Sequence, residues 1–116
     1  MYKILIIFIV FLLCSCQEDE AKQNIVPEKL LTRDQMVHVL VDLELAEAAV
    51  TMTNLPNHAA IFRFKRYEKQ IFGKHSIDST VYQQNFEFYM KRLVDAEYIH
   101  RGVLDSMLIR KNKKIF

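Results

Sequence analysis

The stretch that decides the fold runs from Leu31 to Val50 and reads LTRDQMVHVLVDLELAEAAV. Thr32 and Gln35 have the spacing of a capping box, in which each side chain accepts a hydrogen bond from the backbone N–H of the other residue. Leu31 and Met36 flank the box as a hydrophobic staple. The sequence therefore predicts that a helix begins directly after Thr32.

Apolar residues cover most of the circumference of this helix. Two neighbouring stripes recur at helical spacing: Met36, Leu40, Leu43 and Val50, and then Val37, Val41, Leu45 and Ala48. A helix that is apolar around most of its surface is buried among other elements. We therefore expect this helix to be the central one of the domain.

Further helices are expected on both sides of short breaks. A turn at 51–56 precedes a helix over 57–72, which we expect Gly73 to end in the left-handed conformation. Asp78 is expected to cap a third helix, and a break at 91–94 separates it from a fourth.

The inward-facing residues of these helices follow from helical spacing. They are Ala60, Phe64, Tyr67 and Ile71 in the second helix, Tyr82, Phe86, Tyr89 and Leu93 along the third, and Tyr98, Ile99, Val103, Met107 and Leu108 in the fourth. Ile77 and Tyr82 form a second hydrophobic staple.

The composition favours an all-α fold. The 116 residues include only two glycines and two prolines, and no alternating strand pattern runs for more than a few residues. We expect a small bundle of three to four helices over 27–110. The formal net charge of +2 comes without a basic face of interleaved aromatics, so nothing indicates a nucleic-acid partner.

The first residues have the order of a secretory signal peptide, because Lys3 precedes the apolar run ILIIFIVFLL at 4–13. This run is too short for a membrane span, which needs about 20 apolar residues as a helix. The sequence predicts a signal peptide over 1–15.

The segment Leu13-Cys14-Ser15-Cys16 resembles a bacterial lipobox, with a leucine three residues before the cysteine and a small residue directly before it. Cys16 fits this pattern, whereas Cys14 follows the bulky Leu13. The resemblance implies a diacylglyceryl group on the Cys16 thiol and acylation of the new amine, for example with palmitate. The alternatives are secretion without lipid and an uncleaved signal that tethers the chain.

An acidic tether is expected over 16–26, because Gln17-Glu18-Asp19-Glu20 follows the lipobox directly. This stretch resembles the signal that sends lipoproteins of Bacteroidota to the outer face of the outer membrane. The chain is then expected at the cell surface, with the periplasmic face of the outer membrane as the alternative.

Four stretches resemble a family of Bacteroidota lipoproteins, the domain of unknown function 4296, over about 26–108. They are Val26-Pro27-Glu28-Lys29, DLELAEA at 42–48, YEKQIFGKH at 67–75 and Phe86-Glu87-Phe88-Tyr89. Ser76 stands where members of the family often have glycine. The resemblance implies a location and a domain extent, and it implies no activity.

A polar group on the central helix is the first candidate site. It comprises Asp42, Glu44 and Glu47, with His75 further along the chain. Glu44 lies well round the helix from Asp42, so the carboxylates do not converge as metal ligands or as catalytic groups would need to. We expect His38 and Asp42 to face water and Glu44 or Glu47 to pair with Lys74 or His75. We expect no catalytic residue, bound metal or cofactor.

An aromatic and basic patch is the second candidate site. Phe62 and Phe88 fall off the main stripes of their helices, and Arg66 and Lys69 lie on the same side as Phe62. Exposed, they would form a docking surface for a partner protein. The alternative is burial in a second contact between helices.

The chain ends in RKNKKIF at 110–116, which we expect to be a frayed basic tail over 111–116. The alternative is contact with anionic headgroups or lipopolysaccharide. Together these observations predict a lipid-anchored envelope protein, not an enzyme, that acts as an interaction or accessory module of the outer membrane with an envelope protein partner. The alternative is a small hydrolase, or a ligand- or metal-binding protein, that uses the acidic group.

Overall fold

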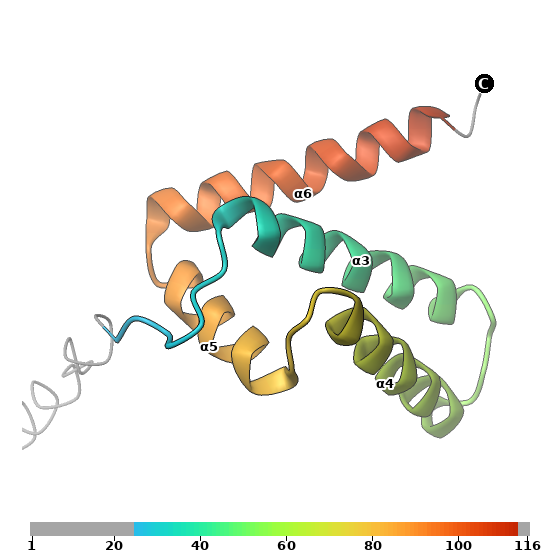
Figure 1. Ribbon diagram of the computed structural model, residues 1–116. Coiled ribbons are helices and arrows are strands. Elements are labelled where there is room, and N and C mark those ends of the chain that lie inside the picture. The colour runs from blue at the N-terminus through green and yellow to red at the C-terminus, as the bar shows by residue number, and fades with distance from the viewer. Residues whose placement is uncertain (1–24, 114–116) are drawn as a thin grey trace, which may run out of the picture.

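The structure, a computed structural model, describes residues 25–113 and shows an all-α domain of four helices (Figure 1). The helices are α3 (Arg33–Thr51), α4 (Asn57–Lys74), α5 (Ser79–Met90) and α6 (Leu93–Lys113). α3 lies between α4 and α6 and contacts both, and α5 lies at the end where α3 and α6 begin. The predicted helical bundle with α3 at its centre is confirmed.

The predicted signal peptide, the lipidated Cys16 and nearly all of the tether lie outside the described residues. Among the helices of residues 25–113, none combines the length and the apolar character that crossing a membrane requires.

The beginning of α3 is the capping box that the sequence predicts. The Thr32 hydroxyl accepts from the Gln35 N–H at 3.1 Å, and the Thr32 N–H donates to Gln35 Oε1 at 2.8 Å. Such a cap stabilises a helix by about 1 kcal/mol. Leu31 and Met36, the predicted staple, are both buried in the same cluster.

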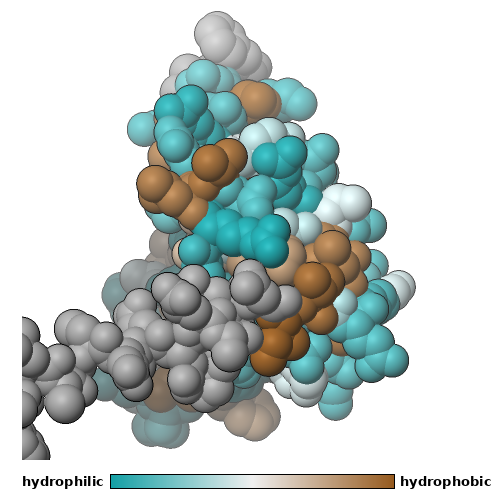
Figure 2. Space-filling view, turned by 90° about the vertical axis from the view of Figure 1, so that its left-hand side faces the viewer, coloured by the Kyte–Doolittle hydropathy of each residue, from teal (hydrophilic) through white to brown (hydrophobic). Residues whose placement is uncertain are grey.

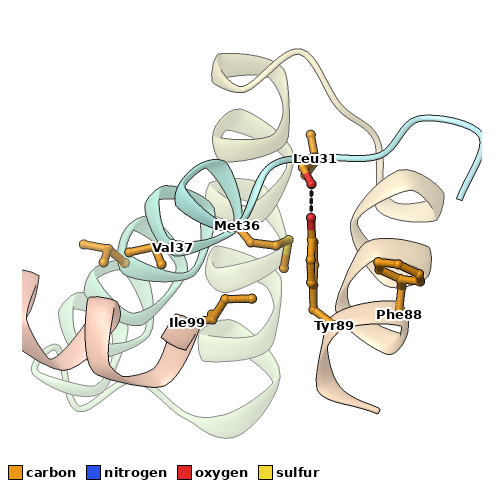
Figure 3. Packing of buried hydrophobic residues seen from close by; sticks show 7 residues of the cluster. Leu31, Met36, Val37, Phe88, Tyr89 and Ile99 are labelled. Carbon is orange, nitrogen blue, oxygen red and sulfur yellow. Dashed lines mark hydrogen bonds between the residues drawn. The ribbon is translucent and has the colours of Figure 1, made fainter. Parts of the chain in front are cut away.

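The core consists of two buried clusters that share α3. The first joins α3 to α5 and α6 and comprises Leu31, Met36, Val37, Val41, Phe88, Tyr89 and Ile99 (Figure 3). The second joins α3 to α4 and comprises Val39, Leu43 and Phe72. Val39 lies outside the predicted stripes yet is buried, because it stands one turn before Leu43 on the side that faces α4. Ala48, placed in a stripe, is exposed.

The close approach of α6 to α3 depends on Gly102. A Cβ atom at this position would lie 2.8 Å from Cγ2 of Val37, closer than atoms in contact tolerate. Ile99, one turn earlier on α6, is fully buried against the same cluster. A glycine is therefore what allows the two helix backbones to come together here.

The segment before α3 is held to α5 by a fully buried amide. Asn85 Oδ1 accepts from the Leu31 N–H, and Asn85 Nδ2 donates to the carbonyl oxygens of Lys29 and Val81, each at 2.8 Å. The Tyr89 hydroxyl donates to the Leu31 carbonyl oxygen (Figure 3). We call residues 27–31 the strap, because these bonds fasten them across α5.

The end of α4 differs from the prediction. The helix continues through Gly73, which is not left-handed, and the left-handed residue is Ser76 with φ of 56°. The Ser76 N–H donates to the Gly73 carbonyl oxygen, and the Ile77 N–H donates to that of Phe72. Ser76 thus occupies a conformation that costs a residue with a Cβ atom about 1 kcal/mol and glycine almost nothing.

The residues of α4 that were expected to face inward are less buried than predicted. Ala60, Phe64, Tyr67 and Ile71 are only partly buried, and Phe72 is the residue of α4 that the core encloses. The Phe72 ring packs, tilted by 30°, against the Tyr82 ring of α5 with 5.1 Å between the ring centroids, so this side of α4 faces inward.

The predicted cap of α5 is confirmed, because Asp78 Oδ1 accepts from the Val81 N–H at 2.8 Å. The aromatic stripe is only partly right, since Tyr89 is buried whereas Phe86 and Leu93 are exposed. The chain breaks between α5 and α6 at 91–92, so Leu93 does not continue the face of α5.

On α6, Ile99, Val103 and Met107 face the core as predicted, whereas Tyr98 and Leu108 are exposed. The helix continues to Lys113, so the first bases of the predicted frayed tail form its last turn. The prediction of a frayed tail from 111 onward is wrong for 111–113, and 114–116 lie outside the described residues.

Candidate functional site

The most connected polar group of the described domain joins α3 to the end of α4. Oδ2 of Asp42 accepts from Lys74 Nζ at 2.9 Å and lies 2.7 Å from His75 Nε2. Asp42 and His75 are partly buried, and Lys74 is exposed. Both partners stand where α4 ends, at which a base also gains from the helix dipole.

Two opposing effects act on the Asp42 carboxyl. Burial raises its pKa, but the hydrogen bonds and the positive charges of Lys74 and His75 outweigh burial and hold the pKa below the ordinary value of 3.8. Asp42 is therefore ionised at neutral pH, and its charge is matched by its partners. The arrangement clamps α3 to α4 rather than presenting a free proton donor.

The structure revises the predicted pairing of this acidic group. Asp42, expected to face water, is the carboxylate that meets the bases, whereas Glu44 and Glu47 are exposed. Glu44 stands two residues from Asp42, which places it about 200° round the helix. Of the four residues Asp42, Glu44, Glu47 and His75, only Asp42 and His75 come together. His38 is exposed, as expected.

Neither a metal centre nor a closed pocket forms around Asp42. Within residues 25–113, no group of three or more His, Cys, Asp or Glu side chains is placed to hold a metal ion. An open hollow of about 470 Å³ lies nearby between α3 and α4, lined mainly by apolar side chains such as Leu45, Tyr67 and Ile71 together with Lys74. Asp42 and His75 do not line it.

Phe62 of the second candidate site is exposed. The residue is 72% exposed to solvent, although phenylalanine is usually buried. Arg66 and Lys69 follow at four and seven residues, which places them on the same side of α4, and both are exposed. We call Phe62, Arg66 and Lys69 the outer face of α4, because the opposite side packs against α3.

Phe88 does not belong to this surface. It is only 8% exposed on α5, its ring meets that of Tyr89 edge-on at 5.1 Å, and the Arg92 guanidinium lies over it at 4.2 Å. The prediction of one exposed patch with both phenylalanines is wrong. For Phe88, the alternative of burial between helices is confirmed.

Sequence reasoning also missed an exposed apolar side of α6. Leu93, Leu104 and Leu108 are 82%, 57% and 56% exposed. Leu93 and Leu108 were expected to face inward, because helical spacing alone does not show which of two apolar sides meets the core. The signal that could have found this side is that apolar residues extend round much of the circumference of α6, more than one neighbouring helix covers.

The comparisons with known proteins give a family. Residues 27–113 match the model of a domain of unknown function, DUF4296, and the chain belongs to this family. Neither the comparison with curated proteins nor the comparison with solved structures found a match.

Proposed function

We propose that this chain, as a member of that family, is a lipid-anchored envelope protein that binds a partner protein through the outer face of α4. The observation that carries the proposal is the exposure of Phe62 on the same side of α4 as two bases, Arg66 and Lys69. Burying a phenylalanine contributes about 1.5–3 kcal/mol, so an aromatic ring left open at the surface is a ready binding anchor.

The chemistry of this face favours a protein partner with acidic groups. Aromatic and arginine side chains dominate the binding energy of protein interfaces, and Phe62 and Arg66 stand one turn apart. The bases would guide an acidic surface toward Phe62 and exclude a basic one. Glu68, the acid nearest in sequence, is already paired with Lys65 at 3.4 Å.

The beginning of the sequence supports the proposed location. A basic residue, an apolar run and the lipobox-like segment ending in Cys16 together favour export and lipid attachment. Two or more acyl chains on Cys16 would hold the chain stably on a bilayer. We propose the outer face of a Bacteroidota outer membrane, with its periplasmic face as the alternative.

The alternative of a hydrolase or ligand-binding protein lacks a comparable observation. It needs Asp42, Glu44, Glu47 and His75 to meet in a shielded site, and only Asp42 and His75 adjoin. The interaction module is therefore the function that the geometry supports best.

A photo-crosslinking residue placed at Phe62 in the full chain, in intact cells, tests the proposal. We expect one protein to crosslink at stoichiometric yield, and we expect the product to disappear when Arg66→Glu and Lys69→Glu are added. The matched control carries the crosslinker at Gln83, which is exposed on α5. Equal crosslinking patterns at Phe62 and Gln83 would show that the outer face of α4 binds no specific partner.

A further inference from the structure

α6 carries apolar side chains on two sides, about 110° apart round the helix. On one side Ile99, Val103 and Met107 meet the core. On the other, Leu93, Leu104 and Leu108 are exposed by more than half. We call this second side the outer stripe of α6, which follows helical spacing through Leu93, Glu97, Arg101, Leu104, Leu108 and Lys111.

A helix with apolar residues round much of its circumference normally has all of them covered. α3 covers only one side of α6, and all six residues of the outer stripe are exposed. The helix dipole explains why Arg110, Lys111 and Lys113 gather in the last turn, but it gives no reason for exposed leucines beside them. The simplest physical account of the exposed leucines is that another surface, outside this domain, covers them.

The charges of the outer stripe favour an anionic surface. Its one acid, Glu97, is paired with Arg101 at 2.6 Å. The bases Arg110, Lys111 and Lys113 mark one end of α6, and the exposed Lys91 and Arg92 stand just before the other end. Positive charges therefore lie near both ends of α6, with the exposed leucines between them.

The spacing of the leucines favours a membrane over a protein. Leu93 and Leu104 stand about 16 Å apart along the helix, with Glu97 and Arg101 between them. A protein interface gathers its apolar anchors at one centre. Figure 2, which faces the end of the domain where α6 begins, shows hydrophobic and hydrophilic residues side by side on that end. A bilayer interface accepts spaced leucines while lysine and arginine reach the phosphates.

We propose that α6 lies flat on an anionic membrane surface, with its outer stripe against the headgroups. α4 lies on the other side of α3 from α6 (Figure 1), so contact of α6 with the membrane leaves the outer face of α4 free to bind a partner. The binding of that partner rests on the proposed function, whereas the contact of α6 with the membrane does not. A tether over 16–26 can reach up to about 40 Å, enough for a lipid-anchored domain to settle in this way.

A single tryptophan tests the proposal, because the sequence contains none. The full chain with Leu104→Trp is reconstituted into vesicles of brominated phosphatidylcholine, with or without phosphatidylglycerol. With phosphatidylglycerol, we expect a blue shift and a loss of emission by bromine quenching. Both effects should weaken at high salt and when Lys111→Glu is added, since screening and charge reversal remove the attraction.

The matched control is Phe62→Trp on the outer face of α4, which should remain unquenched in every vesicle. An unquenched Leu104→Trp chain would leave the outer stripe to a protein partner and overturn the proposal. Quenching of Phe62→Trp instead would place the wrong side of the domain on the membrane, and it would overturn the proposal as well. Sedimentation of the chain with the neutral vesicles reports the N-terminal anchor separately, so failure of the anchor is distinguishable from failure of α6 to dock.

Discussion

Replacing Asn85 by alanine is expected to destabilise the domain more than any change on its surface. The substitution removes three hydrogen bonds and leaves the Leu31 N–H and the Lys29 carbonyl without the amide that pairs them. The Val81 carbonyl loses the bond from the Asn85 side chain, but it lies within α5 and keeps its backbone hydrogen bond in the helix. A buried polar group left unpaired, such as the Leu31 N–H, costs about 1–3 kcal/mol, and the Lys29 carbonyl is partly buried. We therefore expect a loss of about 3 kcal/mol in the free energy of unfolding.

Such a loss is a large share of the stability of a domain of this size, which is about 5–10 kcal/mol. Because 1 kcal/mol shifts the midpoint of thermal unfolding by about 4–8 °C in small domains, the Asn85→Ala chain should melt roughly 15 °C lower. Circular dichroism during heating and urea denaturation of the full chain both measure the effect.

The strap gives this prediction a local readout as well. If Asn85 holds residues 27–31 on α5, trypsin should cleave after Lys29 faster in Asn85→Ala at temperatures where the helices remain folded. Gln84→Ala, at an exposed neighbouring position, is the control and should change stability by no more than about 0.5 kcal/mol. If Asn85→Ala behaves like Gln84→Ala in both assays, the reasoning about the buried amide is wrong.

Three further expectations concern other parts of the chain. Gly102→Ala should destabilise by about 1–3 kcal/mol because its Cβ would collide with Val37, whereas Gly73→Ala, with open space around it, should stabilise by about 0.5–1 kcal/mol; urea denaturation that ranks them the other way would contradict the close approach of α3 and α6. Asp42 has a depressed pKa in the folded state, so its stabilising effect should be present above pH 3.8 and lost as the pH falls through the lower folded pKa; the stability of Asp42→Asn should vary less with pH over that acid range, and parallel profiles would refute the ion pair. Cys16→Ala should lose the acyl mass by mass spectrometry and move to the soluble fraction, and an unchanged mass would exclude Cys16 as the lipidated residue.

Interactions between residues within one or two helical turns of each other could be predicted from the sequence. The capping box at Thr32, the Asp78 cap and the break between α5 and α6 depend on residues a few positions apart, so their spacing in the chain is their spacing in space. The apolar circumference of 36–50 likewise predicted the central helix, because a helix apolar on several sides needs neighbours on several sides. Gly73 misled the reasoning because the left-handed turn moved to Ser76, a residue that disfavours it.

The sequence by itself thus determined the presence of the helices, the caps at Thr32 and Asp78, and the central place of α3. The targeting features at the N-terminus stay a prediction. Only the tertiary structure decided which sides of α5 and α6 are buried, that Asp42 meets His75, and that Asn85 binds the strap at Leu31. Those partners stand 33 and 54 residues apart, and helical spacing says nothing about contacts at such separation. The exposure of Phe62 and the burial of Phe88 follow from the same cause, because the placement of neighbouring helices decides which of two apolar sides meets the core.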